Sequence, residues 1–434
     1  ADPATVSFAP DTAIGRDAFV YGAGTNGTAL GMSAYVTGAN SVALGAGSRA
    51  SEANVVSVGG GTGTYPATRR IVNVADGVAD SDAATVGQLE AATQDTRYFA
   101  ASGGADSDNG AFVDGEYATA SGESATATGE GASAYGSGSF ALAEASTAIG
   151  FNAVADQANA LAVGASSAAL GEYAVAVGSE SVAEGFAATA LGAAAEASGD
   201  GSLAAGTLAV ASGDESTALG AFAEATGNLA TATGAESVAS GNESSAIGAM
   251  SIASGHYATA LGSRAEASGF NSTSLGSWSA ATGFNATAVG ADSVASGDDS
   301  VALGQAAIAS GAESVAIGGS SFLGFFPTES SGDYSTAVGA GAWATGENST
   351  ALGNFSTAAG ENSTALGAGS FASADNSVAL GVASVADRDN TVSVGSEGAE
   401  RQITNVAAGT EATDAVNLSQ LEAATADNRY FQAT

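Results

Sequence analysis

The chain has 434 residues, with 62 glycines, no cysteine and no lysine, and its 45 acidic residues outweigh nine arginines to give a formal net charge of −36. Such a chain repels nucleic-acid phosphates and anionic lipids, and without cysteine it forms neither disulfides nor thiolate metal sites. No apolar run reaches the roughly 18–20 residues that span a bilayer, so we expect a soluble chain or a piece of a protein that is anchored elsewhere.

The N-terminal part of the chain, residues 1–69, contains short repeats that end in glycine, such as Asn-Ser-Val-Ala-Leu-Gly at 40–45. Fixed-period repeats of this kind indicate a stack of short structural units. We therefore expect a small repeat domain over residues 1–69.

Residues 70–100 lack this repeat. They begin in extended chain at Arg70 and end in a short helical pattern, in which Val86 and Leu89 lie three residues apart behind the acidic Asp82. We predict that this segment adapts the wide repeat domain to a narrow helical bundle.

The long middle part of the chain carries a strict period. Between Gly122 and Gly318 a glycine recurs every seven residues, and only Ala143 and Gln157 replace it. Two kinds of half-repeat alternate, so that the full unit is a 14-residue repeat. Seven residues allow a strand of about five and a two-residue turn, for which glycine supplies the positive φ. We predict an all-β fold, a narrow parallel β-roll solenoid of 14-residue coils, over residues 101–400.

Positions within each half-repeat, numbered one to seven with glycine last, differ in side-chain size. The third and fifth positions are small and are expected to fill the roll, whereas the fourth and sixth point outward. On one strand the sixth position is mostly serine or threonine; on the other it is a nearly continuous aliphatic stripe, which a soluble monomer rarely exposes. We predict that identical chains bury the stripe around a rotation axis. Its members include Leu191, Leu219, Ile247, Leu261, Leu275, Leu303 and Ile317.

An aromatic segment at 320–332 interrupts the period, because it contains seven residues more than the pattern allots. We expect it to leave one corner while the roll continues in phase. Exposed aromatic side chains serve either a binding tip or a cap that packs on a neighbouring subunit, and we favour packing. The large side chains concerned are Phe322, Leu323, Phe325 and Phe326.

Three rings, those of His256, Phe270 and Phe284, recur at the 14-residue spacing in one turn column. Stacked coils place them on adjacent rungs. This ladder is either a contact for a ligand or, as we favour, plain stacking that stabilises the roll.

The non-repeat cassette of 70–100 returns at 401–434, where Gln420 and Leu421 match Gln88 and Leu89. The two arginines that open the cassettes, Arg70 and Arg401, are predicted to hold acidic or carbonyl groups of a neighbouring chain, since guanidinium suits bidentate capture of carboxylates.

Catalysis and metal binding are not indicated. His256 is the only histidine, and no acid and base recur at a defined spacing, so we expect neither an enzyme nor a cofactor. The stretch from Asp106 to Gly110 begins like a calcium loop, but Tyr117 stands where such loops carry a bidentate glutamate. We therefore expect no metal site.

The repeats at 40–48, 348–356 and 376–384 resemble the head repeats of YadA-like trimeric autotransporter adhesins, and the cassette Asn-Val-Ala…Asp-Ala-Val-Asn-x-x-Gln-Leu resembles their neck. The resemblance covers nearly the whole chain. It implies a left-handed β-roll homotrimer whose necks lead into a helical coiled coil, displayed on a Gram-negative outer membrane by a coiled-coil stalk and a C-terminal β-barrel. We expect this chain to be a passenger piece that contains neither the full stalk nor the barrel. The implied layout is a small head at 1–69, a neck at 70–100, a large head at 101–400, and a second neck with the start of the stalk at 401–434.

The leading functional hypothesis is an adhesin head that binds host extracellular matrix, cell-surface molecules or other bacteria. Related heads bind collagen, so the resemblance makes collagen a candidate. The alternative is a passive spacer or surface-layer protein whose binding function lies elsewhere. A solenoid enzyme is a third possibility, but one face would have to carry a catalytic cluster that the sequence does not show. Nucleic acid is not an expected partner.

Overall fold

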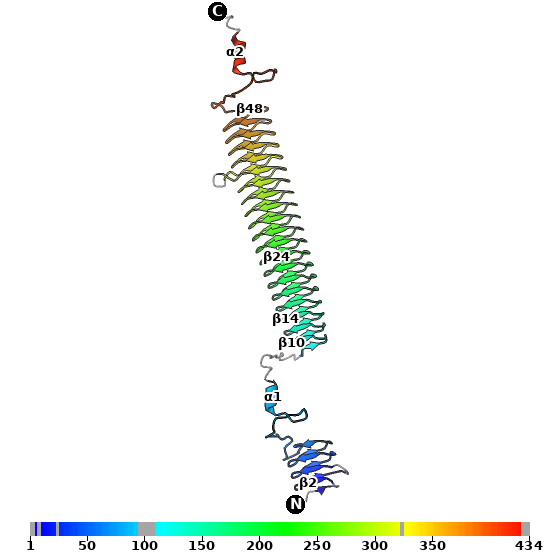
Figure 1. Cartoon of the computed structure of the whole chain (residues 1–434). Helices are drawn as coiled ribbons and strands as arrows, with labels where there is room; N and C mark the ends of the chain where they lie inside the picture. The colour runs from blue at the N-terminus through cyan, green and yellow to red at the C-terminus, as the bar shows by residue number, and fades with distance from the viewer. Residues whose placement is uncertain (1–4, 7–9, 23–25, 94–108, 322–324, 427–434) are drawn as a thin grey trace, which may run out of the picture. The chain divides into compact units, whose positions relative to one another are not determined.

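The computed structural model describes residues 5–6, 10–22, 26–93, 109–321 and 325–426. The chain divides into two compact units, Ala1–Ala100 and Ala101–Thr434. In each unit a stack of short strands is followed by a short helix (Figure 1). No helix in the described ranges is long and apolar enough to cross a membrane.

The strands of the first unit form two parallel sheets, with the orders β1-β3-β5-β7 and β2-β4-β6-β8. Each strand pairs with the equivalent strand of the next coil, as Thr5 does with Phe19 and Thr12 with Thr28. The helix α1 spans Val86–Thr93. The strands are β1 Thr5–Val6, β2 Thr12–Ile14, β3 Phe19–Val20, β4 Thr28–Leu30, β5 Tyr35–Val36, β6 Val42–Leu44, β7 Arg49–Ala50 and β8 Val56–Ser57.

The second unit is a parallel β-roll in which each coil adds one strand to each of two sheets. In the first, here called sheet A, three-residue strands recur once per coil. They run from β10 (Thr119–Ser121) to β38 (Val315–Ile317) and from β40 (Thr336–Val338) to β46 (Val378–Leu380), and β48 (Val392–Ser393) completes the sheet.

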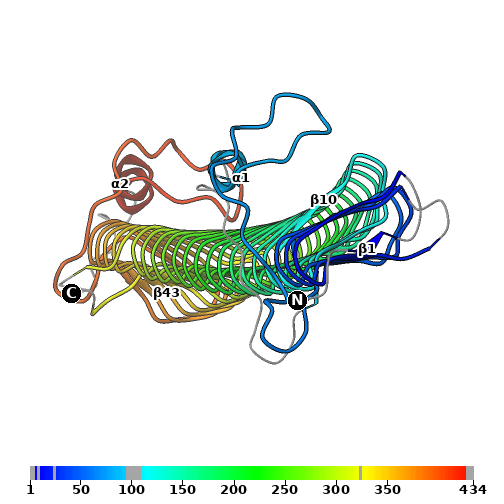
Figure 2. The same cartoon turned by 90° about the horizontal axis from the view of Figure 1, so that it is seen from below.

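The second sheet, here called sheet B, contains two-residue strands at the same spacing. They run from β9 (Phe112–Val113) to β37 (Ile308–Ala309) and from β39 (Glu329–Ser330) to β47 (Val385–Ala386). The helix α2 (Leu418–Ala426) follows the roll. Seen along the stack, the coils are flat loops (Figure 2). The predicted all-β roll of 14-residue coils is confirmed.

The interior of the roll is filled by small side chains. In β24 (Thr217–Leu219), Ala218 is fully buried while Thr217 and Leu219 reach the surface. Alanine and serine fill the described interior of this unit, where Thr328 is the largest fully buried side chain. The predicted inward and outward positions are confirmed, and the roll is thin because two sheets that meet through methyl and hydroxymethyl groups lie close together.

Glycine occupies the turns after the two sheets for two different reasons. After sheet A it adopts a positive φ, for example 138° at Gly220, which side chains rarely tolerate. After sheet B, a Cβ on Gly213 would lie 2.0 Å from the carbonyl oxygen of Gly227 on the next coil, so close approach is the reason there. The expectation that glycine supplies positive φ is therefore wrong for alternate turns. Ala143 and Gln157 both occupy this second kind of turn, where φ does not exclude a side chain.

The aromatic insert leaves the roll without changing its register. Val315 of β38 pairs with Thr336 of β40, and Ile308 of β37 pairs with Glu329 of β39. Each of these offsets is three half-repeats long, whereas pairs elsewhere in the roll are two half-repeats apart. The additional seven residues therefore sit outside the ladder, and the predicted continuation in phase is confirmed.

Each neck helix begins with a reciprocal cap. Gln88 accepts hydrogen bonds through Oε1 from the N–H groups of Gly77 (2.9 Å) and Thr85 (3.1 Å), and its Nε2 donates to the carbonyl of Gly77 (2.9 Å). The N–H of Gln88 in turn donates to Oγ1 of Thr85, which is a capping box. Gln420 repeats the arrangement with Gly409 and Asn417. Both glutamines therefore fasten a loop of the neck onto its helix.

The arginine that matches Arg401 is Arg69, and the prediction that named Arg70 is wrong by one residue. Arg401 donates to Oγ of Ser384 (2.8 Å) and to the carbonyls of Val394 (2.7 Å) and Val382. Arg69 makes the equivalent bonds in the first unit, to Oγ of Ser48 and to the carbonyls of Val58 and Ala46. The groups that the guanidinium holds belong to its own chain, where they tie the last coil to the neck.

The neck loops are expected to loosen in acid. N–H groups of Ala79 and Val78 donate to Asp82, and these bonds lower the pKa of its carboxyl below the ordinary 3.8. Because the folded pKa is depressed, this stabilisation is present above 3.8 and is lost as the pH falls through the folded value. Hydrogen exchange at Ala79 should therefore quicken below about pH 4 relative to the intrinsic rate.

Asp82→Asn is the control for this prediction, since the amide keeps an acceptor oxygen and has no carboxyl to titrate. The same acid-induced loss of protection in this variant would contradict the assignment. The second neck offers a repeat of the experiment, because bonds from Glu411 and Thr410 likewise lower the pKa of Asp414.

Candidate functional site

The aliphatic stripe lies on the outer face of sheet A. Parallel pairing places successive members on adjacent strands, as for Ile247 beside Leu261 and Leu261 beside Leu275. The named members are 36% to 42% exposed in the single chain. We call this set, Leu191, Leu219, Ile247, Leu261, Leu275, Leu303 and Ile317, the aliphatic seam. Ala205 and Thr233 interrupt it in the same column, but its members are accessible and can contact another chain.

The base of the insert is packed on the roll of its own chain. The ring of Phe326 lies 5.7 Å from that of Phe355, edge to face, and 6.3 Å from that of Trp343. The indole N–H of Trp343 donates to the carbonyl of Pro327 (2.9 Å), and buried Thr328 donates to the carbonyl of Gly339 (2.8 Å). These contacts show that the loop is clamped at its end by residues of its own chain.

The tip of the insert is more exposed than its base. Phe325 is 73% exposed, against 39% for Phe326. Phe322 and Leu323, which were also predicted to take part, lie outside the described residues. Sequence reasoning missed Trp343 and Phe355 as partners of the loop. Their signal was their position, since both are large outward side chains on coils that directly follow the insert.

The turn column at 256–284 forms a ring ladder. Phe270 and Phe284 stack with centroids 5.2 Å apart and planes 7° apart, and His256 lies 6.5 Å from Phe270. Tyr257 meets Phe270 edge to face at 5.6 Å. The predicted placement of these rings on adjacent coils is confirmed. Because Tyr257, Phe270 and Phe284 remain 44% to 49% exposed, the stack also presents ring edges and faces to the surroundings.

The same edge of the roll, where sheet B turns into sheet A, carries acidic side chains that make specific bonds. Asp298 accepts the backbone N–H of Phe284 (2.9 Å), one coil earlier. Asp200 does the same for Phe186 (2.9 Å), whose ring meets Tyr173 edge to face at 5.7 Å. We call this border edge B. Its carboxylates face the surroundings and also accept hydrogen bonds from turn amides.

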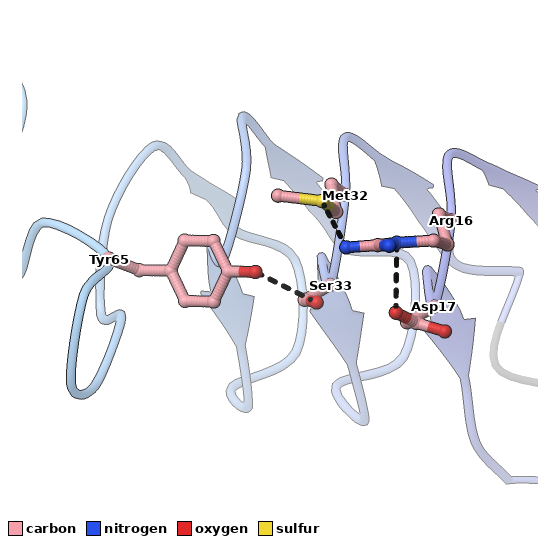
Figure 3. Close-up of polar contacts among 5 residues, drawn as sticks. All are labelled: Arg16, Asp17, Met32, Ser33 and Tyr65. Atoms are coloured by element: carbon pink, nitrogen blue, oxygen red, sulfur yellow. Dashed lines mark hydrogen bonds and ion pairs between the residues drawn. The ribbon is translucent and has the colours of Figure 1, made fainter. Parts of the chain in front are cut away.

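The opposite edge contains a contact that sequence reasoning did not find. The guanidinium of Arg264 lies 4.4 Å from the ring centroid of Trp278, and its Nε donates to Sδ of Met250 (3.2 Å). The first unit has a similar pair, Arg16 and Met32, shown in Figure 3. The missed signal is again a 14-residue spacing, because the three residues of the large roll occupy the same turn position.

Figure 3 also shows a contact between the strand stack of the first unit and the chain that follows it. The hydroxyl of Tyr65 donates to Oγ of Ser33 (3.1 Å), so the chain after the last coil folds back onto the turns. The neighbouring ion pair of Arg16 with Asp17 (3.4 Å) is exposed on both sides and contributes little stability.

The turns hold several large side chains in a left-handed backbone conformation. Trp278 and Tyr257 have a φ of 60°, and Phe222 has a φ of 58°, where bulky residues are rarely found. Asparagine, which tolerates this region better, occupies the same turn position at Asn271 and Asn285. The large residues therefore cost backbone energy that asparagine would lower.

Among the described residues no group of three or more histidine, cysteine, aspartate or glutamate side chains is placed to hold a metal ion. The calcium-like stretch that starts at Asp106 falls outside the described residues as far as Asp108.

Comparison with known proteins places the chain in a family. The family model for the YadA head domain repeat matches residues 23–48, 37–62, 114–139, 141–167, 157–181, 169–195, 183–209, 197–223, 211–237, 239–265, 267–293, 295–321, 330–356, 344–370 and 372–397. The model for the coiled stalk of trimeric autotransporter adhesins matches residues 70–110 and 402–433. Since the head repeat alone matches more than half of the residues, the chain belongs to the YadA-like trimeric autotransporter adhesins.

Among solved structures, the crystal structure of the collagen-binding domain of the Yersinia adhesin YadA is similar in sequence, with 32% identity. The match covers 43% of this chain and 85% of that domain, with a TM-score of 0.29. A search of curated proteins gave no significant match.

The contacts of the insert predict unequal effects for its two phenylalanines. Phe326→Ala should lower the free energy of unfolding by about 1–2 kcal/mol, because a half-buried ring loses part of the ~3–5 kcal/mol of a core phenylalanine. Phe325→Ala, which removes an exposed ring, should leave stability unchanged. Thermal and urea unfolding of both variants test this difference, and equal stability of the two would contradict the described packing.

Proposed function

We propose that this chain is the head and neck region of a bacterial surface adhesin that binds host matrix proteins, cell-surface molecules or other bacteria. Family membership supports adhesion and display at the outer membrane of a Gram-negative cell. The observation that carries binding by this part of the molecule is the exposed rings at the tip of the insert and in the ladder at 256–284. A roll whose interior is filled by alanine and serine does not need these rings to fill its core.

The active form in this proposal is a homotrimer closed along the aliphatic seam. Burying an aliphatic side chain from water contributes roughly 1.5–3 kcal/mol, and the named seam residues have more than a third of their surface still exposed. A stripe on one sheet face can be shared equally by three chains around an axis. The opposite face, with its serine and threonine column, then stays in water together with both edges.

The surfaces that we propose for recognition are the tip of the insert at Phe325 and the ring ladder of His256, Phe270 and Phe284. Collagen is one candidate ligand, because the similar Yersinia domain is described as collagen-binding. Aromatic side chains, phenylalanine among them, are enriched at the cores of protein interfaces. Binding, and not catalysis, is the proposed mode of action.

A passive spacer is the second candidate function. The uniform hydrogen-bonding of successive coils favours it, because a long regular roll is a stiff support for a binding site placed elsewhere. The two functions differ in whether the isolated chain adheres.

Adhesion is tested with the purified chain on immobilised collagen, other matrix proteins, epithelial cells and bacteria. We expect saturable binding to at least one surface, weakened roughly tenfold by Phe325→Ala, as for an aromatic hot spot. Phe222→Ala is the matched control, since it removes one exposed ring from a regular turn. Absence of binding to every surface would favour the spacer.

The oligomer is tested by placing charges in the seam. Leu219→Asp, Ile247→Asp and Leu261→Asp together should convert the trimer into a 41.0 kDa monomer, because unpaired buried charges cost several kcal/mol each. The control is aspartate at Ser212, Ser240 and Ser254 on sheet B, which should leave the trimer intact. Light scattering reports the mass, and a monomeric unmodified chain would refute the proposal.

A further inference from the structure

We propose that edge B around Phe270 and Phe284 docks a basic, extended segment of a partner polypeptide. Its arginine or lysine side chains would lie on the ring ladder and pair with Asp298 and Asp299. This inference deepens the proposed adhesive function, on which it rests, by naming the chemistry of the partner. The ladder, the carboxylates beside it and the charge of the whole edge support it independently.

The ladder offers surface that a cation can use. Phe270 and Phe284 lie parallel on adjacent coils and are nearly half exposed, and Tyr257 stands at right angles to Phe270. A guanidinium or ammonium group within about 6 Å of such a ring is attracted by its π face, and the aliphatic stem packs on the ring edges. The ladder alone would suit any apolar partner, so the charges around it decide which kind of partner binds.

Two carboxylates lie directly beyond the last ring. Oδ1 of Asp298 accepts the N–H of Phe284 (2.9 Å), and Oδ1 of Asp299 accepts from Nδ2 of Asn285 (2.8 Å). Within the described part of the chain, Oδ2 of either aspartate has no hydrogen-bond partner. The bonds through Oδ1 fix both side chains at the end of the ladder, so an incoming cation meets carboxylates that are already ordered.

The charge of the surroundings excludes an anionic partner. Glu243 precedes the ladder on edge B, and Glu313 follows Asp298 and Asp299. Arg264 is the only lysine or arginine between residues 98 and 387, and its turn lies on the opposite edge of the roll. Charges separated by more than about 8–10 Å are largely screened at physiological salt, so the neighbouring acids govern what approaches the rings.

The combination of rings and acids occurs a second time on the same edge. Tyr173 and Phe186 form a ring pair, and Asp200 accepts the N–H of Phe186 as Asp298 does for Phe284. The two sites are seven coils apart, since 284 − 186 and 298 − 200 both equal 98. At about 4.8 Å per coil this is roughly 34 Å, the reach of about ten extended residues. One long basic segment can therefore engage both sites, which raises its avidity.

The experiment measures binding of a 20-residue peptide of alternating arginine and glycine to the full purified chain, by fluorescence anisotropy at physiological salt. The test variant carries Asp298→Asn and Asp299→Asn. Asparagine preserves the hydrogen bond, as Asn228 shows by accepting the N–H of Asp214. We expect the peptide to bind roughly five- to tenfold more weakly to this variant, as two carboxylates are lost at a partly desolvated site.

The matched control carries Asp375→Asn and Asp389→Asn. These aspartates accept turn N–H groups on the same edge and change the net charge equally, but no aromatic ladder adjoins them. We expect less than a twofold effect on peptide binding. An equal loss in both double variants would show that the peptide responds to overall charge and would overturn the proposal.

The rings are tested in the same assay. Phe270→Ala with Phe284→Ala should weaken binding roughly three- to tenfold, as two exposed cation–π contacts predict, whereas Phe222→Ala on the opposite edge should not. Unchanged binding by the ring variant would overturn the proposal, as would equal affinity for a peptide of alternating glutamate and glycine. Adhesion to cells or matrix without selective peptide binding refutes this inference alone, and selective peptide binding without adhesion refutes the adhesive function alone.

Discussion

The close approach of successive coils is the constraint from which the rest of this molecule follows. A Cβ on Gly227 would come within 2.1 Å of the carbonyl oxygen of Gly241, and the other glycines of the sheet B turns approach the next coil as closely. Between these turns, two sheets meet through alanine and serine. Little apolar area is buried per residue, so the hydrogen-bond ladder and the outer side chains supply a larger share of stability than in a globular core.

Different positions of one repeat therefore have different roles. The small inward residues and glycine define the coil, and the outward residues are free to differ from coil to coil. Sheet A uses that freedom for aliphatic side chains, sheet B for serine and threonine, and the turns for rings and carboxylates. A surface feature is therefore built from side chains that occupy the same repeat position on successive coils. The ring ladder at 256–284 and the methionine, arginine and tryptophan of the opposite edge both arise in this way.

Most of the fold could be predicted because a strict 14-residue period leaves few alternatives. It determined the parallel pairing, the inward columns and the register across the insert. What could not be predicted depends on atomic distances. The role of Trp343, for example, follows from where Pro327 places its carbonyl. The need for glycine in the turns after sheet B likewise comes from contact with the next coil, which the composition does not reveal. The match of Arg401 to Arg69 is different, because the offset of 332 residues that relates Gln420 to Gln88 also gives it from the sequence.

The acids of edge B are not explained by the fold alone. An aspartate at this turn position accepts an N–H of the preceding coil, but Asn228 and Asn242 form the same bond without charge. Carboxylates stacked one coil apart, as at Asp200 and Asp214, also repel one another across about 4.8 Å. Aspartate at these turns therefore costs electrostatic energy that asparagine would avoid. The negative charge must contribute something beyond the hydrogen bond, either to solubility along the whole roll or, where it adjoins exposed rings, to recognition of a cation.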